Sequence, residues 1–443
     1  MRLSAAIVYS DHSAQILLGG LGLRMFGASI GMTNRTNLMA AIKSGHWPSL
    51  VGAWLHFEVS FMVWLLIGAL SVTMAEEFGL SASQKGLLVA LPLLGGALLR
   101  IPVGLWNDRV GSKTVGLALL MAQALVLLWG WVGVTTFNHL LGVALLLGAA
   151  GASFAIALPL ASRSYPPESQ GLAMGIAASA NSGTVLAFLF APRLAEPLGW
   201  RGVCGLMLCA VVVSCVAFAL LVQPDDPAPR RAPEDPRVGA LARLARLTRQ
   251  PRLYELSSLY AVTFGGFVGL SSYLPILFRD QYGLSLVEAG TITALCGLGG
   301  SLIRPVGGLV ADRVGALTVL RGLFPLLLVL LLVVSAMPAL VPMLTLSVAI
   351  VTAFGFGNGV VFRLVGDRFG DQMGAATGVI GAAGALGGFV LPLLFGLLKE
   401  ATGSFRGGFL IPAVLCLVAT VSVLWQTRRH RMAELGQVRS FSH

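Results

Sequence analysis

The chain has 443 residues, of which 56% are hydrophobic and 11% are charged, and its mean hydropathy is +0.84. Soluble domains are roughly 45–50% apolar and about 25% charged, so this composition excludes a water-soluble globular protein and indicates one that crosses a membrane many times. The net charge of +11 does not indicate nucleic-acid binding, because the basic residues lie in short clusters between apolar runs, where they set membrane topology.

Residues 1–49 form the least readable part of the chain, and we assign them as a poorly defined N-terminal segment. Their apolar stretch is short and is interrupted by Arg24. No basic n-region leads to a small-residue cleavage site, which argues against a cleaved signal peptide. Met32 and Met39 are alternative starts.

From Leu50 onward the sequence contains twelve apolar runs of about 20 residues, the length of an α-helix that crosses a ~30 Å hydrocarbon core. The sequence therefore predicts an all-α membrane protein with twelve transmembrane helices. The expected helix centres are Trp64, Ala97, Ala124, Ala150, Gly183, Val211, Phe267, Gly297, Leu328, Phe354, Gly387 and Val418.

The second and eighth apolar runs are copies of one another. The stretch GGALLRIPVGLWNDRVG at 95–111 recurs 204 positions later as GGSLIRPVGGLVADRVG at 299–315, and a GLS triplet precedes each copy at the same spacing. Such a duplication predicts two pseudo-symmetric bundles of six helices, which we place at 50–222 and 253–427.

Residues 223–252, between the two bundles, are rich in proline and charge and predict a linker, in which LARLARLTR is typical of a basic amphipathic helix at a membrane surface. Basic residues are concentrated in alternate loops, in this linker and in the tail 428–443. The positive-inside rule therefore places the linker and both termini in the cytoplasm, with the protein in the inner membrane.

Two arginines lie inside apolar spans. Arg100 and Arg304 each precede an aspartate by eight residues, so each side chain begins about 12 Å from the cytoplasmic loop, near the middle of the bilayer. A cation there costs at least ~2.5 kcal/mol, and arginine does not lose its proton. Either Glu58 or backbone carbonyls compensate the charge, or both arginines face a central cavity where a transported anion does so. A guanidinium fork matches a small planar oxyanion.

The loop GLWNDRVG and its copy GLVADRVG resemble the G-x-x-x-D-R-x-G signature of the major facilitator superfamily. This resemblance extends over residues from about 50 to 430 and implies the major facilitator fold. It also implies that Asp108, Arg109, Asp312 and Arg313 gate the transporter and do not bind substrate.

A narrower resemblance is to the nitrate/nitrite porters. It is carried by HFEVSFMVWLLIGAL, GGALLR, SANSGT, LYAVTFGGFVGLSSYLP, GGSLIRP, FGNGVVFRLV and GVIGAAGALGGFVLP, although SANSGT has serine and alanine where glycines are usual. The resemblance implies that Arg100 and Arg304 bind nitrate, that Phe154 and Phe264 enclose the flat anion, and that Tyr260 donates a hydrogen bond to it. Without it, Phe154 and Phe264 read as packing residues.

Two amides are expected at matching depth within the membrane. Asn181 and Asn358 either form interhelical hydrogen bonds or contact the anion or an arginine. Arg363, one turn past Asn358, is expected to extend to the cytoplasmic surface, with an anion relay as the alternative.

Uptake of an anion into a cell at about 100 mV, negative inside, costs ~2.3 kcal/mol, so accumulation needs coupling. Symport with protons and exchange with internal nitrite both meet this need. The first helix resembles the proton-coupled branch, so we expect proton-coupled uptake of nitrate, with nitrite as a further substrate, by alternating access. Glu58 and His56 are the candidates for proton coupling, beside Tyr260. A nitrate/nitrite antiporter and a facilitator for another small anion are the alternatives.

The sequence shows no sign of enzymatic chemistry. Its six histidines have no spacing that could hold a metal, and no nucleotide-binding loop is present. We therefore expect no enzyme, metal or cofactor, and a monomer whose partners are nitrate or nitrite, protons and lipid.

Overall fold

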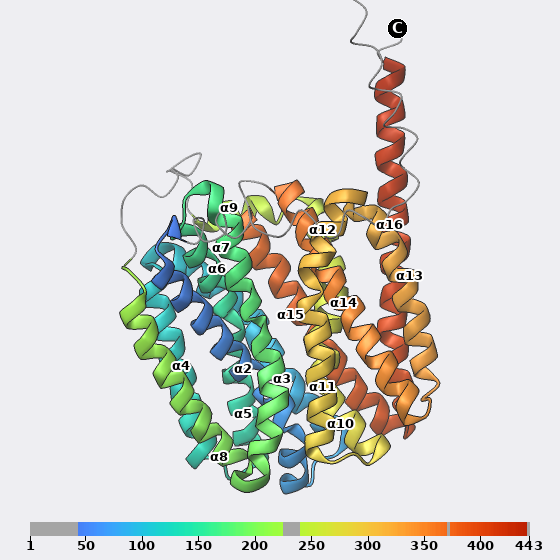
Figure 1. Ribbon diagram of the computed structural model, residues 1–443. Helices are drawn as coiled ribbons and strands as arrows, with labels where there is room; N and C mark the ends of the chain where they lie inside the picture. The colour runs from blue at the N-terminus through green and yellow to red at the C-terminus, as the bar shows by residue number, and fades with distance from the viewer. Residues whose placement is uncertain (1–42, 225–239, 370–372, 441–443) are drawn as a thin grey trace, which may run out of the picture.

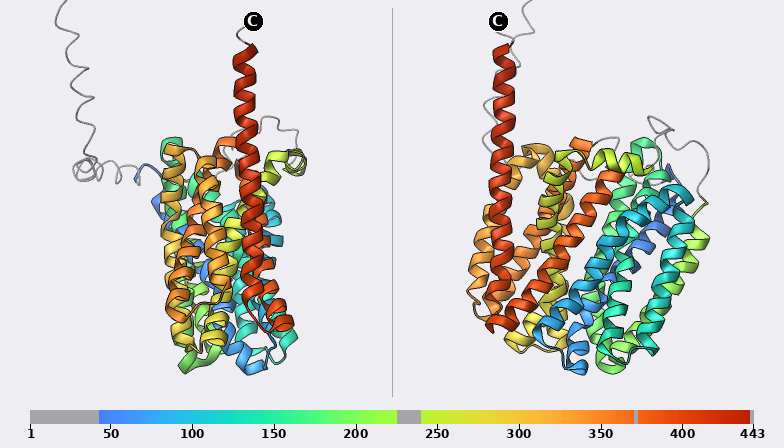
Figure 2. Two further views of the ribbon diagram at one scale, coloured as in Figure 1. Left: turned by 90° about the vertical axis from the view of Figure 1, so that its right-hand side faces the viewer. Right: turned by 180° about the vertical axis from the view of Figure 1, so that it is seen from behind.

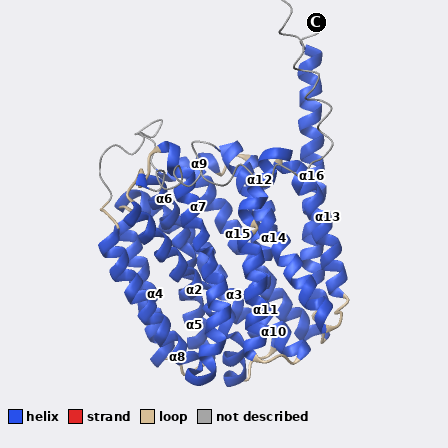
Figure 3. Ribbon diagram, in the orientation of Figure 1, coloured by secondary structure: helices blue, strands red, loops and turns tan. Residues whose placement is uncertain are grey.

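The computed structural model describes residues 43–224, 240–369 and 373–440. Most of the expected N-terminal segment and the middle of the linker therefore lie outside the described residues. Within the described ranges the regular elements are all helices (Figure 3), as the composition predicts.

The twelve predicted spans are confirmed. Eleven stretches of the described chain are long and apolar enough to cross a membrane, and one of them, Gln170–Leu221, contains two spans that meet at Gly199, whose backbone is not helical (φ 65°, ψ 166°). Every expected centre falls inside one of these stretches.

The first half of the chain supplies six spans from helices and short 3₁₀ segments, numbered α2 to α8. These elements are α2 (Trp47–Phe78), α3 (Ala82–Val110), α4 (Ser112–Val132), α5 (Phe137–Leu147), η1 (Gly148–Ser153), α6 (Phe154–Arg163), η2 (Pro167–Ser169), α7 (Gln170–Ser179), η3 (Ala180–Ser182) and α8 (Gly183–Leu221). We call this the N half.

The second half repeats the arrangement and follows the linker helix α9 (Ala240–Leu247), in which Arg246 is exposed and Leu247 is buried as expected for an amphipathic segment. Its helices are α10 (Pro251–Tyr282), α11 (Leu286–Leu302), α12 (Arg304–Val314), α13 (Ala316–Ser335), α14 (Leu340–Phe369), α15 (Met373–Thr402) and α16 (Arg406–Ser440). We call this the C half.

Duplicated residues have the same structural task in both halves. Gly79 and Gly283 end α2 and α10 in the left-handed conformation, with φ of 59° and 67°. Ser81 and Ser285 then begin α3 and α11 with capping boxes. Glycine reaches positive φ without steric cost and serine satisfies free N–H groups at a helix start, which explains why the GLS triplet recurs.

The two halves lie side by side, and the linker helix α9 and the projecting end of α16 lie at the same face (Figures 1 and 2). We call this the linker face and the other the opposite face. Many large apolar side chains are exposed on the surface, especially on α4, α8, α13 and α16. Such a surface suits contact with lipid.

Three spans are irregular near their middle. In the N half, 3₁₀ segments η1 and η3 interrupt the fourth and fifth spans, and in the C half α11 passes into α12 at Ile303. Non-helical backbone at membrane depth is tolerated where it is buried in protein or lines a cavity. The break in the fourth span contains a carbonyl that accepts from Arg100, the break at Ile303 directly precedes Arg304, and Asn181 of the break in the fifth span donates to Ser301, three residues before Arg304.

Candidate functional site

The two membrane arginines converge on one aromatic ring. Arg100 lies on α3 in the N half and Arg304 begins α12 in the C half. The Cζ atom of each lies 5.8 Å from the centre of the Phe264 ring, which α10 supplies. Side chains from symmetry-related helices therefore meet at the boundary between the halves, as the duplication predicts.

Arg100 is anchored by backbone carbonyls. Its Nε and Nη2 atoms donate to the Gly151 carbonyl at 3.2 and 2.9 Å, and Nη1 donates across the boundary to the Gly381 carbonyl at 2.5 Å. The side chain is only 2% exposed. The expected alternative of backbone compensation thus holds for Arg100, although carbonyl dipoles leave the net positive charge in place.

Arg304 is held more loosely. Its Nη2 atom donates to the Tyr260 hydroxyl at 3.3 Å, and the residue is partly exposed. Among the described residues neither Arg304 nor Arg100 forms an ion pair with a carboxylate. Two positive charges therefore lie near the same ring, Phe264, without a carboxylate ion-pair partner in the part of the chain that the structure describes.

Aromatic rings enclose the arginine pair. Phe154 lies 5.5 Å from the Arg100 guanidinium, and Tyr260 stacks on Phe264 at 5.1 Å with nearly parallel planes. The three aromatic residues that the family resemblance singled out are thus brought together. Glycines of α15 allow this, because a Cβ at Gly384 would come within 2.6 Å of the Tyr260 ring.

Sequence reasoning missed two further aromatic residues at the site. Phe362 of α14 packs edge-on against Tyr260 and Phe154, with ring centres 4.9 and 6.1 Å apart, and so joins the two halves on the linker side of the arginines. Trp64 of α2 lies 5.6 Å from the Arg100 guanidinium. The sequence does contain a signal for Trp64. It follows Phe57 by seven residues and Phe61 by three, so the three aromatic side chains lie on one face of the same helix.

The two proton-coupling candidates of the first span face different surroundings. His56 is buried against Phe218 of α8 and its Nε2 atom approaches the Gly116 carbonyl of α4 at 3.3 Å, so it faces away from the arginine pair. Glu58 is also buried, and its carboxylate accepts a hydrogen bond from Ser182 of η3 at 2.8 Å. Glu58 does not compensate Arg100, contrary to one of the sequence-based alternatives.

The two membrane amides differ in their partners. Asn181, next to Ser182, donates across the boundary to Ser301 of α11 at 3.0 Å. Asn358 is fully buried, and neither its amide nitrogen nor its oxygen has a hydrogen-bond partner among the described residues. Its neighbour Gly359 packs on the backbone of Arg304, which places Asn358 at the depth of the pair.

The expected gating aspartates pair within their own halves on the linker face. Asp108 accepts a hydrogen bond from Arg163 at 2.9 Å, and Asp312 pairs with Arg363, which also pairs with Asp367. The Arg363 side chain is 42% exposed and thus extends to the linker face, where it pairs with two carboxylates of its own half. The neighbouring basic residues of the motif, Arg109 and Arg313, are exposed and form no ion pair within the described ranges.

A set of charges on the opposite face also escaped sequence reasoning. Lys85 pairs with Asp280 at 2.6 Å and Arg279 pairs with Glu76 at 2.8 Å, and each pair joins the N half to the C half. These four residues line a small cavity of about 250 Å³. The sequence alone does not reveal these pairs. Glu76 and Lys85 lie near the ends of α2 and α3, whereas Arg279 and Asp280 lie about 200 residues later, on α10.

No cluster of three or more possible metal ligands occurs among the described residues. The four cysteines whose positions are at least partly buried, Cys204, Cys215, Cys296 and Cys416, and the exposed Cys209 are all free thiols. The chemistry available at the site is therefore that of two guanidiniums, a phenol, amides and aromatic faces.

Comparisons with known proteins cover most of the chain. The sequence profile described as Major Facilitator Superfamily matches residues 52–390. A protein of Mycobacterium tuberculosis named "Probable nitrate/nitrite transporter NarK2" is 35% identical over 82% of this chain and 91% of its own length. The "Nitrite extrusion protein" of Bacillus subtilis is 30% identical over 90% of this chain and 97% of its own length.

Among solved structures, the chain is similar to a bacterial homologue of the human lysosomal transporter Spinster. The TM-score is 0.69 at 17% identity, and the match covers 86% of this chain and 96% of that one. At this identity the likeness concerns the twelve-helix fold alone.

Proposed function

The chain belongs to the Major Facilitator Superfamily and, within it, to the nitrate/nitrite porters, and on that premise we propose that it carries nitrate, and nitrite as a second substrate, across the inner membrane. The superfamily is one of transporters and not of enzymes. The observation that carries the proposal is the arginine pair, which lies at the boundary of the halves without a carboxylate partner among the described residues.

The chemistry of the pair favours a small planar oxyanion. Each guanidinium group presents its N–H donors in its own plane. The centre of the Phe264 ring lies within 6 Å of the Cζ atoms of both arginines, and that of Phe154 within 6 Å of the Arg100 Cζ atom. Nitrate is flat, carries a diffuse charge and is weakly hydrated, so rings and fixed donors replace its water at low cost. We assign Arg100 and Arg304 as its binding residues, with Tyr260 as a further donor and Asn358 as an amide left free to contact it.

The positions of the links between the halves support the proposal of alternating access. Among the described residues, ion pairs join the halves on the opposite face and a hydrogen bond joins them at mid-membrane, whereas the ion pairs of Asp108 and Asp312 lie within their own halves. The basic residues of the linker side support a cytoplasmic location for that side, by the positive-inside rule. We therefore assign this arrangement to the inward-facing state of the transport cycle. We assign Asp108, Arg109, Asp312 and Arg313 as gating residues that stabilise the outward-facing state.

Proton coupling is the part of the proposal that rests on Glu58. Its carboxyl group is buried at a break in the fifth span, two residues of which, Asn181 and Ser182, connect it to the C half through Ser301. A buried carboxyl group that gains and loses a proton changes the charge inside the membrane at a break that connects the two halves. Exchange of nitrate for internal nitrite is the second candidate, favoured by the relative named "Nitrite extrusion protein".

Uptake into proteoliposomes separates these schemes. With an imposed pH gradient, acidic outside, and no internal nitrite, symport predicts accumulation of labelled nitrate above its external concentration. Exchange predicts no accumulation until nitrite is loaded inside. Failure of nitrate to undergo counterflow under either condition would favour a carrier for another small anion.

A further inference from the structure

The two arginines are duplicates in sequence, yet their surroundings differ. Arg100 is 2% exposed, lies over three aromatic rings and donates to two carbonyls. Arg304 is partly exposed, lies over the Phe264 ring and donates to one hydroxyl. Near-identical motifs thus hold one guanidinium rigidly and the other with few contacts.

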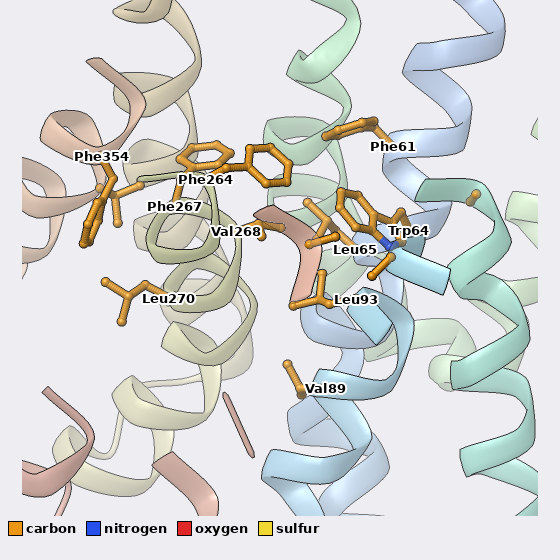
Figure 4. Close-up of a cluster of buried hydrophobic side chains, with 14 of the residues drawn as sticks. Phe61, Trp64, Leu65, Val89, Leu93, Phe264, Phe267, Val268, Leu270 and Phe354 are labelled. Atoms are coloured by element: carbon orange, nitrogen blue, oxygen red, sulfur yellow. The ribbon is translucent and has the colours of Figure 1, made fainter. Parts of the chain in front are cut away.

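Trp64 accounts for much of this difference. It precedes the helix-ending Gly79 by fifteen residues, and the residue fifteen before the equivalent Gly283 is Val268. The N half therefore has an indole where the C half has a small aliphatic side chain, and only Arg100 has such a ring beside it. Figure 4 shows Trp64 and Phe264 on helices of opposite halves, where their rings stack at 6.3 Å and 16°.

The indole is fixed on several sides. It is fully buried, and its Nε1 atom donates to the Pro92 carbonyl of α3 at 2.8 Å. A Cβ at Gly96 would come within 2.9 Å of the indole, and one at Gly151 within 2.5 Å. Trp64 is thus wedged between α3, which carries Arg100, and η1, which carries the carbonyl that accepts from Arg100.

A ring in this position constrains both ends of the Arg100 hydrogen bonds. The centre of the indole ring lies 5.6 Å from the Arg100 Cζ atom, and the indole packs against Gly151. The carbonyl oxygen of Gly151 accepts the hydrogen bonds from Nε and Nη2 of Arg100. Cation–π contact is strongest where water is excluded, and a preorganised group binds a ligand without paying the entropy of ordering.

We propose that Trp64 is a positioning residue that makes Arg100 the fixed arm of the anion site, while Arg304 is the arm that rearranges as the anion enters and leaves. This inference rests on the proposed function of the pair as a nitrate site. Trp64 acts through Arg100 and Gly151 and does not itself bind the anion.

The test compares Trp64→Leu and Trp64→Phe with Trp129→Leu, a matched control whose half-buried indole packs against Gly142 and His139 inside the N half. Two quantities are measured on the full-length protein in liposomes. One is KM and kcat for labelled nitrate counterflow. The other is the rate at which phenylglyoxal modifies Arg100 relative to Arg304, read by peptide mass spectrometry.

We expect Trp64→Leu to raise the nitrate KM about tenfold with kcat changed less, and to increase modification of Arg100 selectively, because the lost contact is a desolvated cation–π interaction. Trp64→Phe keeps a ring and loses the Nε1 hydrogen bond, so its KM should rise about two- to fourfold. If the leucine variant does not fold, the phenylalanine variant decides.

An unchanged KM in both variants would overturn the proposal. So would equal gains in reactivity at both arginines, or a KM shift of the same size in Trp129→Leu, since these would mean general loosening. If the wild-type protein shows no nitrate counterflow, the proposed function fails. The phenylglyoxal measurement does not depend on transport, so selective modification of Arg100 in Trp64→Leu would still support the positioning role of Trp64.

Discussion

At the scale of single residues, the site depends on charges that their surroundings stabilise without neutralising. Arg100 donates to the carbonyls of Gly151 and Gly381, and Arg304 donates to the hydroxyl of Tyr260. Carbonyl and hydroxyl dipoles lower the cost of burying a cation but leave its full charge available to a ligand. An arginine pair without a carboxylate partner therefore suits the proposed anion, whereas an arginine–carboxylate ion pair would not.

Replacing either arginine by lysine should abolish most nitrate transport. Lysine keeps the charge but loses the planar fork, and at Arg100 a single nitrogen would replace the three that donate to the carbonyls of Gly151 and Gly381. We expect counterflow of labelled nitrate to fall at least about 100-fold for Arg100→Lys and for Arg304→Lys, the loss of two charge-assisted hydrogen bonds. Arg246→Lys, on the exposed face of α9, is the control. Retention of more than half of the wild-type rate would contradict the assignment.

The substitution Glu58→Gln tests proton coupling at the residue that the proposal names. Glutamine retains an acceptor for the Ser182 hydroxyl but does not exchange a proton. We expect nitrate accumulation driven by a pH gradient to be lost while nitrate counterflow at equal pH persists. Glu255→Gln, on α10 beside Arg368, serves as a control for removal of a membrane-end carboxylate. Gradient-driven accumulation by Glu58→Gln would exclude Glu58 as the coupling group.

At the scale of elements, the breaks in the helices determine which carbonyls reach the arginines. Gly151 lies in the 3₁₀ segment η1, at the middle of the fourth span, and its backbone is in contact with Trp64. A side chain at this position would push η1 away from α2. The glycine-rich stretch GAAGAS thus allows η1 to pack closely against α2, and it also forms the 3₁₀ segment that interrupts the span.

The substitution Gly151→Ala should disturb both stability and binding. Its Cβ would meet a fully buried indole at 2.5 Å, and overpacking of this kind costs about 1–3 kcal/mol. We expect a lower temperature of unfolding in detergent and a raised nitrate KM, because the carbonyl that anchors Arg100 is displaced. The matched control is Gly175→Ala in α7, where no atom lies within 4 Å of the added Cβ and alanine favours the helix. Equal thermal stability of the two variants would contradict the steric argument.

At the scale of the whole molecule, the charges of the opposite face act between the halves. The Lys85–Asp280 and Arg279–Glu76 pairs each bridge the boundary, beside hydrogen bonds from Ser81 and the Ser83 backbone to Glu400. Opening of this face would separate all of these groups. In the proposed alternating-access cycle, we therefore expect these pairs to stabilise the state in which the opposite face is closed, relative to the state in which it is open.

Reversal of one charge should shift this balance. Lys85→Asp places two carboxylates together, and the double variant Lys85→Asp, Asp280→Lys restores attraction. The reporter is alkylation of the thiol introduced by Ser272→Cys, a buried position on α10 that faces Gly68 of α2. We expect an impermeant maleimide to react roughly threefold to tenfold faster in the single variant, from about 1 kcal/mol of lost pairing and added repulsion, and near the original rate in the double variant.

Lys399→Asp provides the control for the charge reversal, because Lys399 lies on the same face but contacts Gly403 and Phe405 of its own half. Its alkylation rate at position 272 should match that of the unreversed protein. Faster alkylation in Lys399→Asp, or no recovery in the double variant, would show that the Lys85–Asp280 pair does not hold the halves together.

Much of this molecule follows from local sequence alone. Apolar runs long enough to cross a bilayer predicted twelve spans, and the 204-residue repeat predicted that Arg100 and Arg304 occupy equivalent places, because helix length and periodicity depend on residues near one another in the chain. The family resemblance, carried by short motifs, added Phe154, Tyr260 and Phe264, which the fold brings together.

Only the tertiary structure decided what each charged or aromatic side chain meets. Glu58 and Arg100 looked like possible partners by depth, but α2 directs the Glu58 carboxylate toward η3, whereas α3 directs the Arg100 guanidinium toward η1. The rotation of neighbouring helices about their axes is set by packing of all residues at once and not by any one segment. The same reason explains why Trp64 distinguishes two arginines that the repeat makes alike, and why Lys85 meets Asp280 across nearly 200 residues of chain.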